Sequence, residues 1–379
     1  MEKKKGLSLQ TILTIAGLAL VYLLAFLLDR IPGVPIMLTT VLRKGAIYSL
    51  VAVSMNLLNG FTGLFSLGQA GFMLVGAYTF AAINISSGIR STVYQYYEPL
   101  LNFSLTETLQ GALGNTAGTV LGVFISLLLA GLLAAVLAYL IGLPVLKLKS
   151  DYLAIATLGF AEIIRALVQL EAFAPVTNGS QLLRGFPYFT DTFMPFVIVG
   201  ICIAVVVLLI NSTYGRAFKA IRDDEIAAGA SGLNTTYLKV LVFAISAFFA
   251  GIAGGIFAQY IGSLNPTMAG WLNSINYVIM VVFGGMGSLT GSIVSAIGLT
   301  ILPELLRAFA DYRMLAYSVV LVLVMIFRPQ GIFGSWEFSL PRLVNRMLFR
   351  GAAGKGAKPA ASAKQHDQSD DKTVKEASR

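Results

Sequence analysis

The chain has 379 residues, of which 56% are hydrophobic and only 12% charged, and its mean hydropathy is +0.79. Soluble domains carry about 25% charged residues and membrane β-barrels show alternating strands of about ten residues, so this composition excludes both and predicts an all-α, polytopic membrane protein. The net charge is +9, but its basic residues lie in loops and in the tail, so the charge does not indicate nucleic-acid binding. The chain has one cysteine, Cys202, and one histidine, His366, so it can form neither an internal disulfide nor a cysteine–histidine metal site.

Two apolar segments open the chain. Three lysines at positions 3 to 5 precede Leu9–Leu28, which is long for the core of a signal peptide and is not followed by a small-residue cleavage site. We therefore expect an uncleaved first span with a cytoplasmic N-terminus. A second span is expected over about Ile36–Leu58. A charge at mid-bilayer costs about 2.5–3.5 kcal/mol, so Arg43 and Lys44 are expected just outside the hydrocarbon or facing the protein interior.

A glycine-rich stretch, Asn59–Gly71, separates the second span from the apolar Phe72–Ile83. Because glycine costs about 1 kcal/mol relative to alanine inside a helix, the stretch predicts a broken or closely packed helix. Backbone freed at membrane depth must face protein or a water-filled path, whereas small residues also serve helix packing, and both alternatives stay open here. If the stretch lines a translocation path, its candidate residues are Thr62, Gly63, Ser66, Gly68 and Gln69.

The middle of the chain alternates polar loops with apolar runs. Residues 84–117 are too polar to span and are expected outside, as an insertion of unknown role. Val120–Leu143 is expected to return to the cytoplasm and Tyr152–Leu170 to lead out again, with Glu162 and Arg165 able to pair on one helix face. An outer loop with a turn at Asn178-Gly179 precedes the inward span Phe193–Ile210.

The most charged segment between two apolar runs is Gly215–Asn234, GRAFKAIRDDEIAAGASGLN. Its basic residues predict a cytoplasmic position. Asp224 is a good helix N-cap, Glu225 places negative charge at the positive helix end, and Gly232 can take the left-handed position that ends the helix. A helix this short needs packing to be stable, which makes it a candidate docking element. An ordinary solvated loop is the more common interpretation of such a segment, and the residues alone leave both open.

A second glycine-interrupted region follows the span Val240–Ile261 and an outer turn or re-entrant piece at Gly262–Ser274. Apolar Ile275–Phe283 leads into Gly284–Gly291. Interrupted segments in both halves of a chain indicate a mid-membrane path, although the two stretches match too weakly to be a repeat. The candidate path residues here are Gly284, Gly285, Gly287 and Ser288.

Two further apolar runs, Ser292–Leu305 and Leu315–Phe327, complete the expected spans. The count is about 8–10 transmembrane helices, with both ends of the chain in the cytoplasm and most basic residues in inner segments. We predict a transmembrane domain over 1–335, with an outer insertion at 84–117 and a cytoplasmic loop at 211–239; the resemblance described next implies that the domain is a permease and that the loop couples it to an ATPase. Residues 336–379 are expected to form an interfacial segment, with Trp336 and Phe338, and then a disordered cytoplasmic tail.

Several of these motifs resemble LivM-type permease subunits of ABC importers for branched-chain amino acids or urea. Gly60–Ala70 is similar to the signature G-Y-T-G-x-x-S-L-G-x-A, with Phe61 in the place of the tyrosine. Met280–Gly291, Leu302–Arg307 and the closing R-P-x-G at Arg328–Gly331 are also similar to the family. The resemblance covers about residues 36–335.

The charged segment carries the most specific part of the resemblance. Ala227, Ala228 and Gly232 have the spacing of the E-A-A-x-x-x-G motif of importer permeases, in which a glutamate would stand at Ile226; here Glu225 lies one position earlier. In the family this motif forms a coupling helix that docks into an ATPase subunit. The resemblance therefore implies ATPase-coupling roles for Arg216, Arg222, Asp223, Asp224, Glu225, Ala227, Ala228 and Gly232.

The resemblance also implies partners and a location. The expected complex contains a LivH-type permease as heterodimer partner, two ABC ATPase subunits and an extracytoplasmic solute-binding protein, in the bilayer of a bacterial cytoplasmic (inner) membrane. No G-x-x-x-x-G-K-[ST] phosphate loop occurs in the sequence. The chain is therefore expected to be a transporter subunit without a cofactor of its own, and ATP-Mg is expected on the partner ATPases.

Three other functions were weighed. Urea uptake fits the same motifs, because the candidate path residues carry no fixed charge. A proton- or sodium-coupled secondary transporter would need ionisable groups buried in its path, and Glu162 is expected to be neutralised by Arg165. A purely structural membrane subunit would not need paired glycine-broken segments.

Overall fold

The structure is a computed structural model that describes residues 26, 30–31, 35–148, 150–188, 193–307, 312–328, 331–332 and 334. It divides the chain into two units, and the first, Met1–Ala19 with Ser339–Arg379, lies wholly outside the described residues. The predictions for the first span, for the interfacial segment and for the tail fall almost entirely on residues that are not described. All described residues belong to the second unit, Leu20–Phe338.

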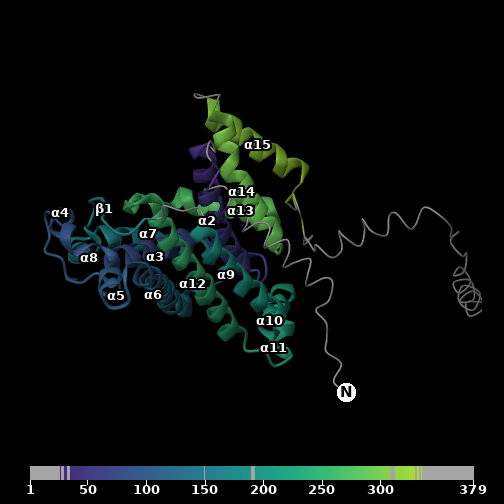
Figure 1. The fold of residues 1–379 in the computed structure, drawn as a ribbon. Helices are drawn as coiled ribbons and strands as arrows, with labels where there is room; N and C mark the ends of the chain where they lie inside the picture. Colours follow the sequence, from purple (N-terminus) through teal and green to yellow (C-terminus); the bar gives the residue numbers. More distant parts are fainter. Residues whose placement is uncertain are drawn as a thin grey trace, which may run out of the picture. The chain divides into compact units, whose positions relative to one another are not determined.

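The described part of this unit is almost entirely helical, which confirms the predicted all-α class (Figure 1). Its α-helices are α2 (Ile36–Asn59), α3 (Gln69–Asn84), α4 (Arg90–Val93), α5 (Leu105–Leu113), α6 (Asn115–Val145), α7 (Ser150–Gln169), α8 (Ala174–Thr177), α9 (Phe193–Asn211), α10 (Thr213–Asp223), α11 (Glu225–Ala230), α12 (Thr235–Ile261), α13 (Trp271–Gly284), α14 (Leu289–Leu305) and α15 (Arg313–Phe327). Short 3₁₀ helices lie at η1 (Ser87–Ile89), η2 (Glu171–Phe173) and η3 (Pro266–Ala269), and the strands are β1 (Leu183–Arg184) and β2 (Ser263–Leu264).

Six of the described helical segments are long and apolar enough to cross a membrane, namely α2, α6, α7, α9, α12 and η3 with α13. A seventh is obtained if α3 is counted with the segment Ser87–Val93, to which it is bent by 93°. Helices α3, α14 and α15 have 16, 17 and 15 residues, fewer than the about 20 that a straight span needs. The chain is thus a multi-pass membrane protein in which some apolar helices are too short to cross alone.

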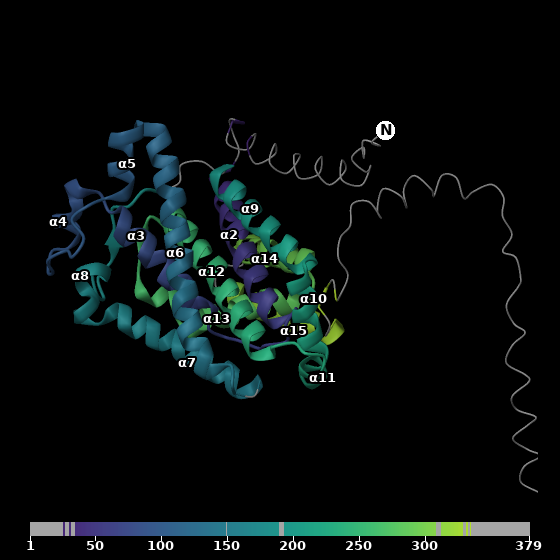
Figure 2. The ribbon, with the colours of Figure 1, turned by 90° about the horizontal axis from the view of Figure 1, so that it is seen from below.

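Helix α12 occupies the centre of the bundle, and Figures 1 and 2 both show it between α6 on one side and α2 with α9 on the other. Small residues bring the helices together. A Cβ atom added to Gly76 of α3 would lie 2.0 Å from the carbonyl oxygen of Gly251 in α12, and one added to Gly254 would lie 1.9 Å from that of Met73. Gly71, the last glycine of the stretch Asn59–Gly71, packs in the same way, since an added Cβ atom there would lie 2.8 Å from the Ala161 Cα of α7. Close packing, one of the two predicted alternatives for that stretch, is therefore present at Gly71.

The predicted outer insertion is folded against the loop that follows α7. We call residues 84–117 together with 171–188 the end cap, because they lie at the end of α12 opposite α11. The Tyr94 hydroxyl donates to the Val176 carbonyl at 2.8 Å, and the Asn178 side-chain amide donates to the Val93 carbonyl at 3.1 Å. Strands β1 and β2 pair antiparallel, with Leu183 opposite Leu264, and so tie the cap to the C-terminal end of α12.

The two charged residues of α2 are both half-buried. The Lys44 ammonium lies 5.5 Å from the centre of the Tyr48 ring, within the range of a cation–π contact. Arg43 also interacts with other groups of the protein. The expectation that these charges face protein groups is consistent with this environment.

Candidate coupling segment and glycine breaks

Helix α10 leads from the end of α9 into the charged segment. Its buried residues Gly215, Phe218 and Ile221 recur every three positions and face the bundle, whereas Arg216 and Arg222 are exposed. The sequence analysis did not predict this helix, because the charged residues of the segment indicated a loop before the short helix that begins at Asp224. The three-residue spacing of its apolar side chains is the signal that would have revealed it.

Helix α11 has the caps that the sequence predicts. The Asp224 carboxylate accepts from the backbone N–H groups of Ile226 and Ala227, at 2.8 and 3.0 Å. At the other end Gly232 has φ +91°, and the backbone bonds Gly232 N–Gly229 O and Leu233 N–Ala228 O are 3.0 and 3.2 Å. These two bonds form a Schellman motif, which satisfies carbonyls that the helix end would leave unpaired.

Helix α11 is held against α12 and presents its other side outward. The Lys239 ammonium of α12 forms an ion pair with Glu225, and Ala228 is buried. The other residues predicted for ATPase coupling are all exposed, namely Arg216, Arg222, Asp223, Asp224, Glu225, Ala227 and Gly232. Ile226, which the sequence analysis did not select, is 85% exposed. Its place beside the N-cap Asp224 was the signal in the sequence that could have selected it.

The first glycine break, residues 60–68 between α2 and α3, is non-helical as predicted. Its polar groups are satisfied inside the protein. The Thr62 hydroxyl donates to the Leu57 carbonyl at 3.1 Å, and the Ser66 backbone N–H donates to the Asn59 side-chain oxygen at 3.1 Å. Gly68 is buried against Thr157 of α7, whereas Gly63 is exposed beside Arg222.

Gln69 begins α3 and links three helices. Its side-chain amide donates to the Ser54 hydroxyl of α2 at 2.8 Å and to the hydroxyl and carbonyl oxygens of Ser246 in α12, each at 3.2 Å. Gln69 is 2% exposed. In this conformation the side chain joins helices and does not face a cavity, and its predicted path role stays a prediction.

The second glycine break, residues 285–288 between α13 and α14, is also non-helical. Gly285 and Gly287 have φ +107° and +88°, a region that favours glycine. The buried Ser288 hydroxyl caps α14 by accepting from the Gly291 backbone N–H at 3.1 Å. Gly284 and Gly291 approach so closely that a Cβ on Gly284 would lie 2.4 Å from the Gly291 carbonyl oxygen.

The two breaks meet, and Asn56 near the end of α2 joins them. Its side-chain amide donates to the Ser288 carbonyl at 2.9 Å and to the Ser292 hydroxyl at 2.8 Å, and its side-chain oxygen accepts from the Gly287 backbone N–H at 2.9 Å. Asn56 is wholly buried. Sequence reasoning missed it, although a carboxamide within the apolar run of a span is itself unusual.

The coupling segment reaches the same place. The Arg222 guanidinium of α10 donates to the Gly60 carbonyl at 3.3 Å and pairs with Asp223 at 2.9 Å. One turn earlier on α10, the Lys219 ammonium lies 5.5 Å from the centre of the Phe61 ring. The structure therefore brings together two residue groups that the sequence analysis treated separately, the coupling segment and both sets of glycines.

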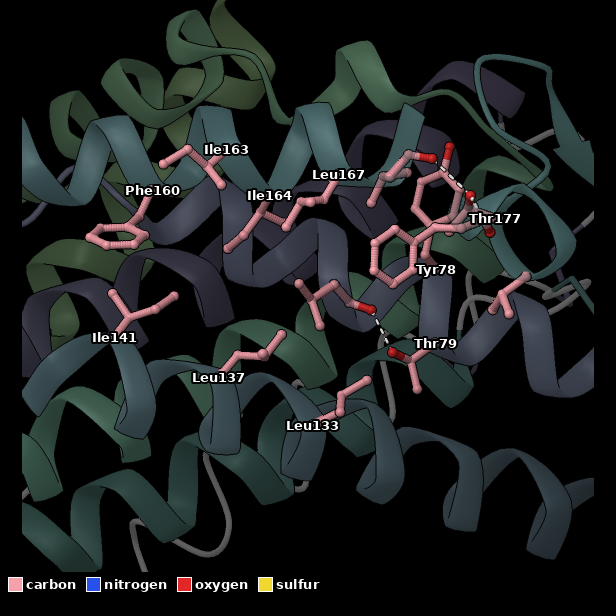
Figure 3. Close-up of a pocket in the computed structure, with 14 residues that line it drawn as sticks. Tyr78, Thr79, Leu133, Leu137, Ile141, Phe160, Ile163, Ile164, Leu167 and Thr177 are labelled. Carbon is pink, nitrogen blue, oxygen red and sulfur yellow. Dashed lines mark hydrogen bonds between the residues drawn. The ribbon is translucent and has the colours of Figure 1, made fainter. Parts of the chain in front are cut away.

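Three pockets of the described part of the chain lie away from this junction. Figure 3 shows one of about 440 Å³ between α3, α6 and α7, into which Tyr78 and apolar side chains of α6 and α7 project. None of the residues predicted to line a path borders this pocket or two others. Its lining carries no charged side chain.

The predicted pair in α7 is present. Arg165 Nε lies 2.6 Å from Glu162 Oε2, and the other carboxylate oxygen accepts from the Trp271 backbone N–H at 3.0 Å, at the start of α13. Glu162 is thus engaged on both oxygens. A neutralised carboxylate of this kind gives no support to ion-coupled transport, which needs an ionisable group that loads and unloads.

Residues 37–328 match the family model described as "Branched-chain amino acid transport system / permease component". The chain belongs to this permease family. The LivM permease protein of the high-affinity branched-chain amino acid transport system of Salmonella typhimurium is 33% identical over 320 residues, 76% of this chain and 67% of that protein.

Two other relatives extend the comparison. LivM of Escherichia coli is 32% identical over 344 residues, which is 82% of this permease and 71% of the relative. LivH of Escherichia coli is 31% identical over 137 residues, 36% of this chain and 44% of that protein. No solved structure matches the chain. The predicted LivM-type resemblance is confirmed.

Proposed function

We propose that this chain is a membrane-spanning permease subunit of an ATP-driven ABC importer for branched-chain amino acids. The observation that carries the proposal is the family match over residues 37–328, and the LivM relatives are named for high-affinity branched-chain amino acid transport. We place it in a bacterial cytoplasmic (inner) membrane with both termini in the cytoplasm. Under this proposal α11 lies at the cytoplasmic side and the end cap at the outer side.

The proposed complex pairs this chain with a LivH-type permease, two ABC ATPase subunits and an extracytoplasmic solute-binding protein. The partial likeness to LivH supports pairing of two related permeases. Because the sequence has no phosphate-loop motif, ATP-Mg is assigned to the separate ATPase chains. The permease itself would contribute no hydrolytic chemistry.

Helix α11 is the proposed contact with one ATPase. Its caps fix a short helix in place, and Ile226 projects from it with 85% of its surface exposed. ATP binding closes the two ATPases, α11 moves with them, and the spans shift between outward-facing and inward-facing states. This is a two-state element that connects two distant sites.

The first test is to isolate the tagged permease in mild detergent and identify the co-purifying chains by mass spectrometry. A second permease and ATP-binding chains are expected, and recovery of this chain alone under conditions that preserve a known ABC complex would contradict the proposal. The companion solute-binding protein is then titrated with leucine and with urea. Binding of urea and not leucine would replace the proposed substrate.

A variant pair tests the docking role of α11. Ile226→Asp places a charge in the proposed apolar contact and is expected to reduce the recovered ATPase at least tenfold. Ile226→Leu keeps the apolar surface and should recover the normal amount. Equal recovery with Ile226→Asp would show that the ATPase binds elsewhere, while the second permease serves as the internal standard for an intact membrane domain.

A further inference from the structure

Helices α2 and α10 and the second glycine break meet at one junction, outside the proposed docking surface of α11. Asn56 uses both donors and its side-chain oxygen on one segment, residues 287–292. No other asparagine in the described spans bridges two glycine breaks in this way. The sequence separation between Asn56 and Ser292 is 236 residues, so the contact fastens the N-terminal hairpin α2–α3 to the C-terminal hairpin α13–α14.

The backbones of the two breaks lie so close together at this junction that a side chain at Gly60 would not fit. A Cβ atom on Gly60 would lie 1.8 Å from the Asn56 side-chain oxygen and 2.3 Å from the Gly287 nitrogen. The two breaks are therefore in direct backbone contact at this point. A displacement of one break must be followed by the other or must break the bonds of Asn56, because packed elements of this kind do not deform continuously.

Arg222 connects this junction to the coupling segment. It lies at the C-terminal end of α10, two residues before the N-cap of α11, and donates to the Gly60 carbonyl at 3.3 Å. Its side chain also packs on Gly63, where an added Cβ would lie 3.0 Å from Arg222 Cγ. The Arg222 Nη1 atom would lie 3.4 Å from a Cβ atom added to Gly287 of the second break, so a shift of α10 moves the guanidinium relative to both breaks.

We propose that Asn56 and Arg222 are positioning residues that form a clasp, through which displacement of α10 and α11 is transmitted to both glycine breaks at once. The inference rests on the proposed function and revises the role of Arg222, which becomes an internal link and not a residue that docks the ATPase. Movement of α11 strains the Arg222–Gly60 contact. The bonds of Asn56 then make the α13–α14 hairpin follow the α2–α3 hairpin.

The test uses the complete transporter in proteoliposomes, with ATP hydrolysis and leucine uptake measured on the same samples. Arg222→Gln removes the guanidinium at an exposed position, and Asn56→Asp removes both side-chain donors at nearly constant size. Asn211→Asp is the matched control, because Asn211 is exposed at the end of α9 and its amide bonds only the Val207 carbonyl of its own helix, at 2.9 Å. We expect both clasp variants to retain the ATPase chains and ATP hydrolysis while uptake per ATP falls at least tenfold, with Asn211→Asp unchanged.

Two outcomes would overturn the clasp. Uptake per ATP equal to that of the unmodified complex in Arg222→Gln would remove the proposed link, whether or not Asn56→Asp folds. Loss of the ATPase chains from Arg222→Gln would instead identify Arg222 as part of the docking surface. A merely structural role would lower the amount of folded complex and leave the ratio of uptake to hydrolysis constant.

A second readout separates this proposal from the proposed function. If the unmodified chain recovers no ATPase or moves no leucine, the proposed function fails, and the clasp is tested on the isolated permease by amide hydrogen exchange. Arg222→Gln should then increase exchange at residues 285–288 as well as at 60–63, by at least threefold. Faster exchange confined to 60–63 would show that the two breaks are not linked through this junction.

Discussion

Gly76 lies where the backbones of α3 and α12 touch. A methyl group there would come within 2.0 Å of the Gly251 carbonyl oxygen, an atom that cannot move without bending α12. Overpacking of this kind costs about 1–3 kcal/mol. We therefore predict that Gly76→Ala lowers the free energy of unfolding by about that amount, measured as an earlier thermal unfolding transition in detergent.

The matched control for Gly76 is Gly159 of α7, where an added Cβ atom meets nothing within 4 Å. Alanine is favoured over glycine in a helix by about 1 kcal/mol, so Gly159→Ala should leave the transition unchanged or raise it. A drop of equal size in both variants would contradict the assignment of the effect to the close approach at Gly76, because helix propensity alone would raise the transition.

Glu107 holds the end cap together by charge-assisted hydrogen bonds. Its carboxylate accepts from the hydroxyl groups of Ser86 and Ser87 and from the Ser87 backbone N–H at 3.1 Å. The bond from the Ser86 hydroxyl, followed by the bond from the Ser87 hydroxyl, lowers the pKa of Glu107 from its ordinary value of 4.5. A depressed carboxyl pKa means that the charged form stabilises the folded cap.

The sign of the pH dependence follows from that shift. The stabilisation is complete above the ordinary pKa of 4.5 and is lost as the pH falls through the lower pKa of the folded protein. Glu107→Gln should therefore unfold earlier than the unmodified chain near neutral pH, and the difference should shrink in acid below the ordinary value. Glu98→Gln, at an exposed position of the same segment, is the control; a difference for Glu107→Gln that is independent of pH would contradict the ionic origin.

At the scale of the element, α11 depends on its N-cap more than a long helix does. It has six residues and so cannot be stable alone. Replacing an N-cap aspartate by alanine costs about 1 kcal/mol, and Asp224→Ala is expected to increase amide exchange over residues 225–230 about fivefold. Asp224→Asn keeps the capping acceptor and should exchange at the normal rate. Unchanged exchange in Asp224→Ala would mean that packing on α12 alone determines the helix.

Local patterns were sufficient to predict several elements. Apolar runs predicted the six described segments that are long and apolar enough to cross a membrane, clustered glycines predicted both breaks, and Asp224 with Gly232 predicted the ends of α11. Each of these is decided by residues close together in the chain. The expected first span lies outside the described residues, and the runs at 72–83, 292–305 and 315–327 form helices α3, α14 and α15. Helix α10 was missed since its three-residue apolar spacing is short and interrupted by charge. The end cap was expected as a polar insertion, and its folding depends on bonds to residues about eighty positions away, such as Tyr94 to Val176, which no local pattern specifies.

At the scale of the whole molecule, the candidate site was predicted in pieces. The coupling residues and the glycines were selected for separate reasons, one for charge and one for backbone freedom. What the sequence could not supply was their meeting point, because the Arg222–Gly60 contact joins residues 162 positions apart. Asn56 was missed for the same reason, because its side chain bonds to residues 287–292, which lie in the other half of the chain.

The arrangement of the whole chain in the membrane gives the last prediction. The positive-inside rule predicts a cytoplasmic position for α11, and the end cap lies at the opposite end of α12. The chain has a single cysteine, Cys202, which is buried. A Cys202→Ser variant therefore has no thiol of its own, and cysteines introduced into it can be labelled one at a time. Gly111 of α5 has open space around it and Gly229 of α11 has only one atom at 4.0 Å, so both accept a cysteine.

A membrane-impermeant maleimide added to spheroplasts should label Gly111→Cys at once and Gly229→Cys only after the membrane is permeabilised. The reason is that a charged reagent cannot cross the hydrocarbon, so labelling reports the side on which each thiol lies. Labelling of both positions after permeabilisation controls for thiol reactivity. The reverse pattern in intact spheroplasts would place α11 outside, where no cytoplasmic ATPase could reach it, and would contradict the docking of α11 together with the clasp that depends on it.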